Sequence, residues 1–169
     1  MTRSGFLVAS GLLYAVTWAW GALVLPSRVP VHFDASGAAD RVVGRGEALV
    51  AFGVLGAAVF ALMLVMTRST ARMSFAWFNI PHKDWWTATE ERRARARAMS
   101  GEDIAVLGGA TMLLLVVVLA VTIGAAEREE SRLGPVFLLA LAVYLLGLAG
   151  FLAHMHLRRY RPDLGEDPA

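Results

Sequence analysis

The 169-residue chain contains no cysteine, and its four longest apolar runs contain neither charge nor proline. Without cysteine there can be no disulfide, thiolate metal site, cysteine nucleophile or lipid anchor through that residue. The apolar runs cover residues 6–25, 49–66, 104–123 and 136–152, and the last can extend to 157. Transporters typically carry ionisable residues or broken helices within their spans, so transport by this chain alone is disfavoured.

Catalytic sequence motifs are also absent. The chain has no G-x-S-x-G, H-E-x-x-H, Walker or dinucleotide-binding pattern, and serine and threonine are scarce in the apolar runs. Hydrolysis within a membrane would need a positioned nucleophile and base. We therefore expect a protein that is not an enzyme and that needs no cofactor.

What the chain does contain is hydrophobic residues, which make up 57% of the sequence and are concentrated in those four runs. A helix needs about 20 apolar residues to cross the bilayer core. The sequence predicts an all-α fold, a four-helix transmembrane bundle in one membrane domain over residues 1–157, with the last span at 136–157. We expect the first span to be retained, because no small-x-small cleavage site follows it. Residues 158–169 are expected to form a disordered tail.

Charge predicts the orientation of the bundle. Lys and Arg number one in residues 1–5, seven in 67–103 and three after 157, against three in 26–47 and two in 124–135. The positive-inside rule then places both termini and the basic insert 67–103 in the cytoplasm. We expect a multi-pass protein of the bacterial plasma membrane. The insert should lie on anionic lipid, and direct binding of nucleic acid is disfavoured.

Capping patterns predict two helix starts in the insert. Thr87-x-x-Glu90 reads as a capping box that opens a short helix over residues 88–99. Ser100-x-x-Asp103 reads as a second N-cap directly before the third span. The insert is therefore expected to be an amphipathic, basic segment that is separate from the spans on either side.

Small residues and tyrosines predict helix contacts within the membrane. Glycine and alanine recur at four-residue spacing, which allows close approach, at Gly53 with Ala57 and at Ala105 with Gly109. Gly147 and Gly150 offer a further contact. Tyr14 and Tyr144 each need a hydrogen-bond partner near mid-membrane.

The loop after the first span gathers His32, Asp34 and Asp40 around Gly37. One imidazole and two carboxylates suit several divalent metals, and the same groups could bind a cationic peptide. The alternative is structural: Asp34 and Ser36 would form side-chain turns around the glycine. A second set of imidazoles, His82, His154 and His156, could share one membrane depth, although residues two apart on a helix point in different directions.

Two polar stretches resemble a known family. Pro30, His32, Gly37 and Asp40 fit the P-x-H-x-x-x-G-x-x-D loop of bacterial membrane proteins related to SdpI, an immunity protein against a secreted killing peptide. A second signature, N-x-P-x-K-x-x-W followed by an arginine-containing helix, is similar to the segment that contains Asn79, Pro81, Lys83, Trp85, Arg92 and Arg93. His82 stands where that family more often has Asn.

The resemblance implies a role in peptide immunity, envelope sensing or signalling. In that reading His32, Asp34, Gly37 and Asp40 bind an extracellular peptide, and the second motif contacts a cytoplasmic regulator. Two other hypotheses stay open. The chain could be a structural or accessory subunit of a membrane complex, in which glycines such as Gly53 matter more than the loop. It could also be a metal-dependent membrane enzyme that uses the second set of imidazoles.

Overall fold

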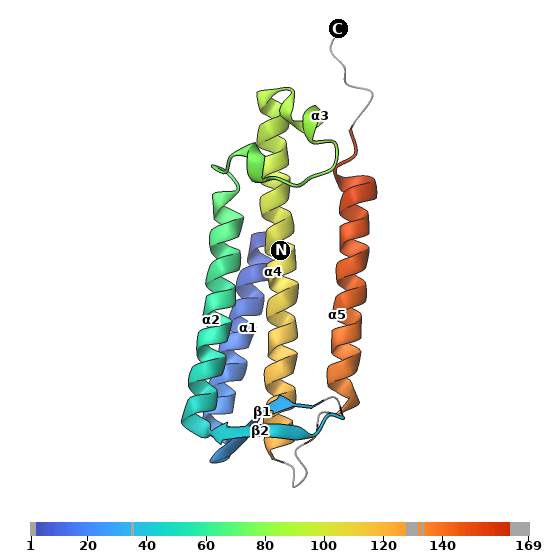
Figure 1. The fold of residues 1–169 in the computed structure, drawn as a ribbon. Coiled ribbons are helices and arrows are strands. Elements are labelled where there is room, and N and C mark those ends of the chain that lie inside the picture. Colours follow the sequence, from blue (N-terminus) through green and yellow to red (C-terminus); the bar gives the residue numbers. More distant parts are fainter. Residues whose placement is uncertain (1–2, 35, 128–131, 133, 163–169) are drawn as a thin grey trace.

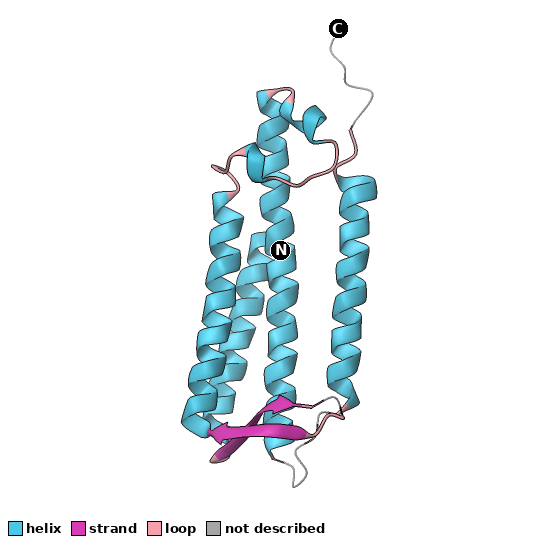
Figure 2. Cartoon of the chain, in the orientation of Figure 1, coloured by secondary structure: helices cyan, strands magenta, loops and turns pink. Residues whose placement is uncertain are grey.

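A computed structural model describes residues 3–34, 36–127, 132 and 134–162. Its long helices are α1 (Arg3–Val24), α2 (Arg45–Ser69), α4 (Glu90–Ala126) and α5 (Pro135–His154). The shorter elements are β1 (Arg28–Phe33), β2 (Ala39–Gly44), the 3-10 helix η1 (Phe75–Trp77), α3 (Lys83–Thr87) and the π-helical turn η2 (Met155–Arg159). The strands lie at one end of the bundle, called here the hairpin end, and η1 and α3 lie at the other, the cap end (Figures 1 and 2).

The four long helices confirm the predicted membrane fold. Each is long and apolar enough to cross a bilayer. Helices α2, α4 and α5 contain the apolar runs 49–66, 104–123 and 136–152, and α1 contains all but the last residue of the run 6–25. The two-stranded sheet is a minor addition to an all-α architecture. The chain is therefore a multi-pass membrane protein whose helices contact the lipid bilayer.

The packed core lies among α1, α2 and α4. Two side chains of α1, one turn apart, donate to backbone carbonyls of α2: the Tyr14 hydroxyl to Phe52 at 2.7 Å and the Trp18 indole to Leu49 at 2.9 Å. Each polar tip is thus satisfied where no water is available. The predicted partner for Tyr14 is confirmed.

Close helix contacts occur at some of the predicted small residues and not at others. A Cβ added at Gly53 would come within 3.2 Å of the Trp18 indole nitrogen, and Ala105 is fully buried. By contrast, a Cβ at Gly147 or Gly150 would meet nothing within 4 Å. The predicted contact at the last two glycines is therefore wrong for the described chain.

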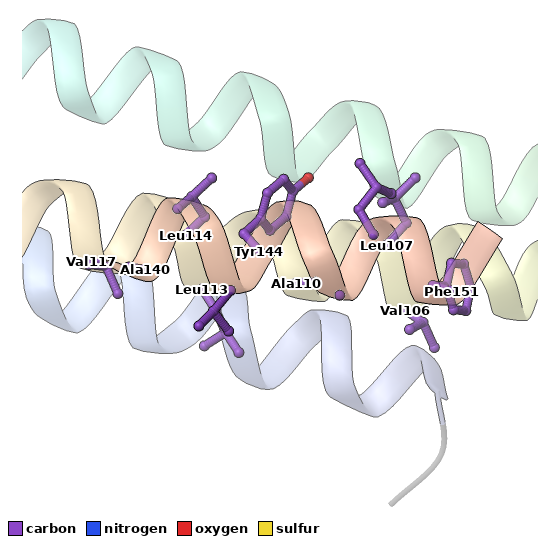
Figure 3. Close-up of a pocket in the computed structure, with 12 residues that line it drawn as sticks. Val106, Leu107, Ala110, Leu113, Leu114, Val117, Ala140, Tyr144 and Phe151 are labelled. Atoms are coloured by element: carbon purple, nitrogen blue, oxygen red, sulfur yellow. The ribbon is translucent and has the colours of Figure 1, made fainter. Parts of the chain in front are cut away.

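Helix α5 stands apart from the core. It packs against α4, and none of its residues is buried. In mid-span the Tyr144 hydroxyl lies 3.0 Å from Thr111 Oγ1 of α4, so the expected hydrogen-bond partner of Tyr144 is present. An apolar groove of about 440 Å³ separates α4 and α5 (Figure 3).

The loop after α1 is an antiparallel β-hairpin, which the sequence had not predicted. Arg28 pairs with Gly44, and Phe33 pairs with Ala39, with register irregularities on either side of His32. Val29 of β1 is fully buried and joins the core. The hairpin is held to the bundle because Arg45, at its end, donates from its backbone to Ser27 and from its guanidinium to Ala22.

The predicted break within the basic insert is wrong. Helix α4 runs without interruption from Glu90 to Ala126, so it joins the second half of the insert to the third span. Its N-cap is Thr89, whose hydroxyl accepts from the Arg92 amide at 3.2 Å. Thr87 instead donates to the Asp84 carbonyl, and Ser100 lies inside the helix, where its hydroxyl contacts Tyr160.

The chain after α5 also differs from the prediction. Helix α5 ends at His154 and continues as the single π-helical turn η2. The disordered tail was predicted to begin at residue 158, but Arg159 lies in η2 and Tyr160 is fully buried. The remainder of that predicted tail, 163–169, lies outside the described residues.

Candidate functional site

The turn of the hairpin is built around the Asp34 carboxylate. Its Oδ1 accepts from the Ser36 amide at 2.8 Å, the Ser36 hydroxyl at 2.7 Å and the Ala38 amide at 3.1 Å. Gly37 follows with φ 80°, a left-handed conformation that glycine adopts without steric cost. The Ser36 hydroxyl and the amide hydrogen bonds stabilise the ionised carboxylate and lower the pKa of Asp34. Asp34 and Gly37 therefore shape the turn, as the structural alternative predicted.

His32 and Asp40 face each other across the hairpin. His32 Nδ1 lies 2.6 Å from Asp40 Oδ1, and their side chains are 67% and 45% exposed. The pair is an ion pair only when the imidazole is protonated. It presents an acceptor and a donor to solvent at the tip of the hairpin, where a ligand can reach both.

The predicted metal ligands do not form a complete site. Asp34 Oδ1 is occupied by the turn, while His32 pairs with Asp40 alone. Within the described part of the chain, no three His, Asp or Glu side chains come together to hold a metal ion. The imidazoles of His82, His154 and His156 are all exposed, and they too form no such group.

The second predicted motif forms a cap over the opposite end of the bundle. Asn79 is exposed and Pro81 is half-buried, in the turn before α3. Lys83, at the start of α3, donates to the Ala76 carbonyl at 3.5 Å. His82 adopts φ 54°, the left-handed region in which Asn and His are enriched among residues other than glycine.

Aromatic rings and arginines connect α3 to α4. The guanidinium of Arg92 lies 4.0 Å from the centre of the Trp85 ring, a cation–π contact. Arg93 donates from Nε to the Thr87 carbonyl at 2.9 Å and pairs with Glu90 at 3.4 Å. Trp85, Arg92 and Arg93 therefore hold α3 against the start of α4, which is a structural role that the motif prediction did not assign.

A charge network centred on the buried Asp103 lies at the cap end, and the sequence analysis missed it. Asp103 of α4 is 4% exposed and receives Arg159 Nε at 2.7 Å from η2 and Arg3 Nη1 at 3.3 Å from α1. Arg159 and Arg3 also pair with Glu102, at 2.9 and 3.1 Å. Two acidic and two basic side chains are thus balanced where three helices leave the membrane.

Tyr160 completes this network. Its hydroxyl donates to Asp103 Oδ2 at 2.8 Å and lies 3.1 Å from Ser100 Oγ. The Tyr160 carbonyl accepts from the Trp86 indole of α3 at 3.1 Å. Burial, with the hydrogen bond to Asp103, raises the pKa of Tyr160, so the phenol stays neutral. We call Ser100, Asp103, Arg159 and Tyr160 the α4–η2 latch.

The sequence contained a signal for the latch. Asp103 directly precedes the third apolar run, and Arg159 and Tyr160 closely follow the fourth. Consecutive spans run in opposite directions, so these boundaries lie at one membrane depth. A carboxylate at such a boundary needs a partner, since an unpaired charge is costly to bury.

Comparison with known proteins finds one family model that is similar to part of the chain. Residues 9–57 match a domain of unknown function, DUF1648. The match covers most of α1, the hairpin and the first half of α2, which is less than a third of the chain. No curated protein and no solved structure matches the chain. The family match therefore agrees with a membrane domain that contains the hairpin, and it assigns no ligand.

Proposed function

We propose that the chain is a membrane-embedded recognition protein whose hairpin binds an extracellular peptide or other envelope signal. The observation that carries the proposal is the exposed second strand of the hairpin. Asp40, Arg41 and Val42 of β2 are all exposed, although both strands contact α2 and Val43 of β2 packs against the core. A two-stranded sheet leaves edge backbone groups available, and an extended peptide can add as a further strand.

The hairpin offers a peptide ligand side-chain contacts as well as a strand edge. The His32–Asp40 pair offers a carboxylate and an imidazole at the tip, and Val42 offers an apolar contact at 41% exposure. Recognition through strand addition takes affinity from the backbone and selectivity from such side chains. The resemblance to the immunity family supports a peptide as the ligand.

Binding is tested by panning a displayed peptide library against the chain in lipid nanodiscs. Peptides enriched over empty nanodiscs should bind about tenfold more weakly to His32→Ala and to Asp40→Ala, because each change removes a hydrogen bond to a charged partner. Arg28→Ala, an exposed change at the other end of the hairpin, is the control. Failure to enrich any peptide, or enrichment that both variants retain, would reject the proposal.

The proposed orientation places the hairpin outside and the cap end in the cytoplasm of a bacterial cell. The cysteine-free chain allows a direct test, because each introduced cysteine is the only thiol. In intact cells an impermeant maleimide should label Arg41→Cys, and it should label Arg72→Cys only after the cells are broken. The reverse pattern would exclude an extracellular ligand for the hairpin.

A second candidate is an accessory subunit of a membrane complex. It is favoured by α5, which buries no residue in this chain and leaves open space at Gly147. In that case Gly147→Leu should dissociate the complex on a native gel while the chain itself stays folded. His32→Ala should then leave the complex intact.

A further inference from the structure

A polar pocket lies at the cap end, away from the hairpin. It has a volume of about 510 Å³ and lies between the first turn of α1, the last turns of α2 and the part of α4 that precedes the membrane. Ser4, Thr67, Thr70, Arg97 and Glu102 supply its polar side chains. Because three helices leave the apolar core at this level, the pocket is open at the depth of lipid headgroups.

Two buried polar atoms around this pocket have no partner. Within the described chain, the buried side-chain nitrogen and oxygen atoms that lack a hydrogen bond are Arg97 Nε and Thr67 Oγ1. Both residues line the pocket. Unsatisfied buried donors are rare because each costs about 1–3 kcal/mol. Two of them on residues that line one pocket favour a ligand that accepts hydrogen bonds.

The charge around the pocket favours an anion. Among the described residues, Arg97 pairs with an acid through Nη1, which lies 3.5 Å from Glu90, a side chain that is 74% exposed and also pairs with Arg93. The Arg97 guanidinium also lies over the Phe75 ring. Glu102 lines the pocket as well, but its Oε2 is held by Arg159 and Arg3 at 2.9 and 3.1 Å. The acidic group is thus neutralised, while a guanidinium N–H and a hydroxyl remain for an oxyanion.

An apolar groove follows the same seam between α1 and α2. Its volume is about 450 Å³, and Val8, Leu12 and Phe60 are among its lining residues. Val8 and Leu12 lie one and two turns beyond Ser4 on α1, and Phe60 lies two turns before Thr67 on α2. The pocket and the groove therefore share one face of the helix pair, with the polar part at the membrane surface.

We infer that this seam binds a phospholipid, with its phosphate in the polar pocket and an acyl chain in the apolar groove. Arg97 Nε and Thr67 Oγ1 donate to phosphate oxygens. Exposed Arg68 and Arg72, from the same segment as Thr67 and Thr70, attract an anionic headgroup. A phospholipid and free phosphate both present a phosphate oxyanion to the pocket. The apolar groove next to the pocket favours the phospholipid, because free phosphate has no acyl chain to occupy it.

Native mass spectrometry of the detergent-purified chain tests this inference with three probes. Dioleoylphosphatidylglycerol should bind at one copy and at least about tenfold more tightly than dioleoylglycerol, which has the same chains and no phosphate. Millimolar inorganic phosphate should not displace it. Equal binding of the two lipids would overturn the inference, and displacement by inorganic phosphate would overturn the lipid as source.

Substitutions locate the site. Arg97→Gln and Thr67→Val should each weaken phosphatidylglycerol binding about tenfold, because each removes one hydrogen bond to a charged oxygen. Arg28→Gln removes the same charge from an exposed residue at the hairpin end, far from the pocket, and should change binding less than about twofold. If Arg97→Gln does not fold, Thr67→Val decides alone, since its lost hydroxyl has no partner within the described chain. Binding by Thr67→Val equal to that by the unmodified chain would overturn the site.

Discussion

Replacement of Asp103 by alanine should release α5 from the bundle at the cap end. The carboxylate is 4% exposed and accepts from Arg159 at 2.7 Å and from the Tyr160 hydroxyl at 2.8 Å. Elsewhere α5 is attached by apolar contacts with α4 and by the hydrogen bond between Tyr144 and Thr111. The α4–η2 latch is therefore the main polar attachment of the last span.

The size of the effect follows from the partners that remain. Breaking a buried ion pair typically costs 3–5 kcal/mol, because the remaining charge is left uncompensated. Here Arg159 keeps Glu102 at 2.9 Å and Tyr160 keeps Ser100 at 3.1 Å, which places the expected loss at the lower end. We expect Asp103→Ala to lower the free energy of unfolding by about 3 kcal/mol.

Two measurements check this prediction. Unfolding in mixed micelles by sodium dodecyl sulfate, followed by tryptophan fluorescence, gives the free energy, and Trp86, whose indole donates to the Tyr160 carbonyl, is one of the five tryptophans that contribute to the signal. Electron–electron distance measurements between spin labels at Val65 of α2 and Leu152 of α5, both exposed, give the position of α5. The cysteine-free chain accepts this pair of labels without further substitution.

The control is Glu91→Ala, which removes an exposed acid from the first turn of the same helix. It should change the free energy of unfolding by less than about 0.5 kcal/mol and leave the distance distribution unchanged. Asp103→Ala should broaden that distribution. A loss below about 1 kcal/mol together with an unchanged distribution would refute the latch as the attachment of α5.

Three further predictions concern other parts of the bundle. Gly56→Leu should lower the free energy of unfolding by about 1–3 kcal/mol, because a Cβ there overlaps the Tyr14 ring, whereas Gly147→Leu, which meets open space, should not. The pKa of the Asp34 carboxyl is lower in the folded hairpin than in the unfolded chain. The ionised carboxylate therefore stabilises the hairpin fully above the usual carboxyl pKa, and this stabilisation is lost as the pH falls through the lowered pKa of the folded state. In acid, the hairpin amides of the unmodified chain should become less protected against hydrogen exchange, and this pH dependence should be absent in Asp34→Ala. Identical pH profiles of protection for the two chains would contradict the prediction. Thr89→Ala should cost about 1 kcal/mol by chemical unfolding, through loss of the α4 cap, and an unchanged midpoint would contradict that role.

The membrane fold could be predicted from the sequence because its signal is local. A run without charge and long enough to cross a bilayer specifies a helix whatever its neighbours are. The first predicted span, 6–25, accordingly corresponds to α1 at Arg3–Val24, and the same holds for the other three. Partners for Tyr14 and Tyr144 were predictable for a related reason, since a phenol in lipid must find an acceptor.

The hairpin could be predicted only in part. The sequence pattern Asp34, Ser36 and Gly37 predicted a turn, and the structure contains it. The strands on either side were not predicted because a two-stranded sheet is marginal alone and needs a surface on which to pack. Val29, fully buried against the helices, supplies that surface contact, and no local pattern reveals it.

The error at Ser100 and the missed latch have one physical origin. A serine before an apolar run resembles an N-cap, because its hydroxyl can accept from the backbone. In the folded chain the hydroxyl contacts Tyr160, 60 residues away in sequence, and α4 continues through the position. The partner is fixed by how α5 and η2 pack on α4, which a pattern within α4 does not contain.

Depth in the membrane nevertheless restricts the choice of partner. Asp103 can be paired only by a cation that reaches the same boundary, and Arg3, beside the first span, and Arg159, after the last, both do so. A search of span boundaries for opposite charges would have found both arginines without any knowledge of packing. The Tyr160 hydroxyl would have escaped it, since its place beside Asp103 depends on the π-helical turn that ends the last span.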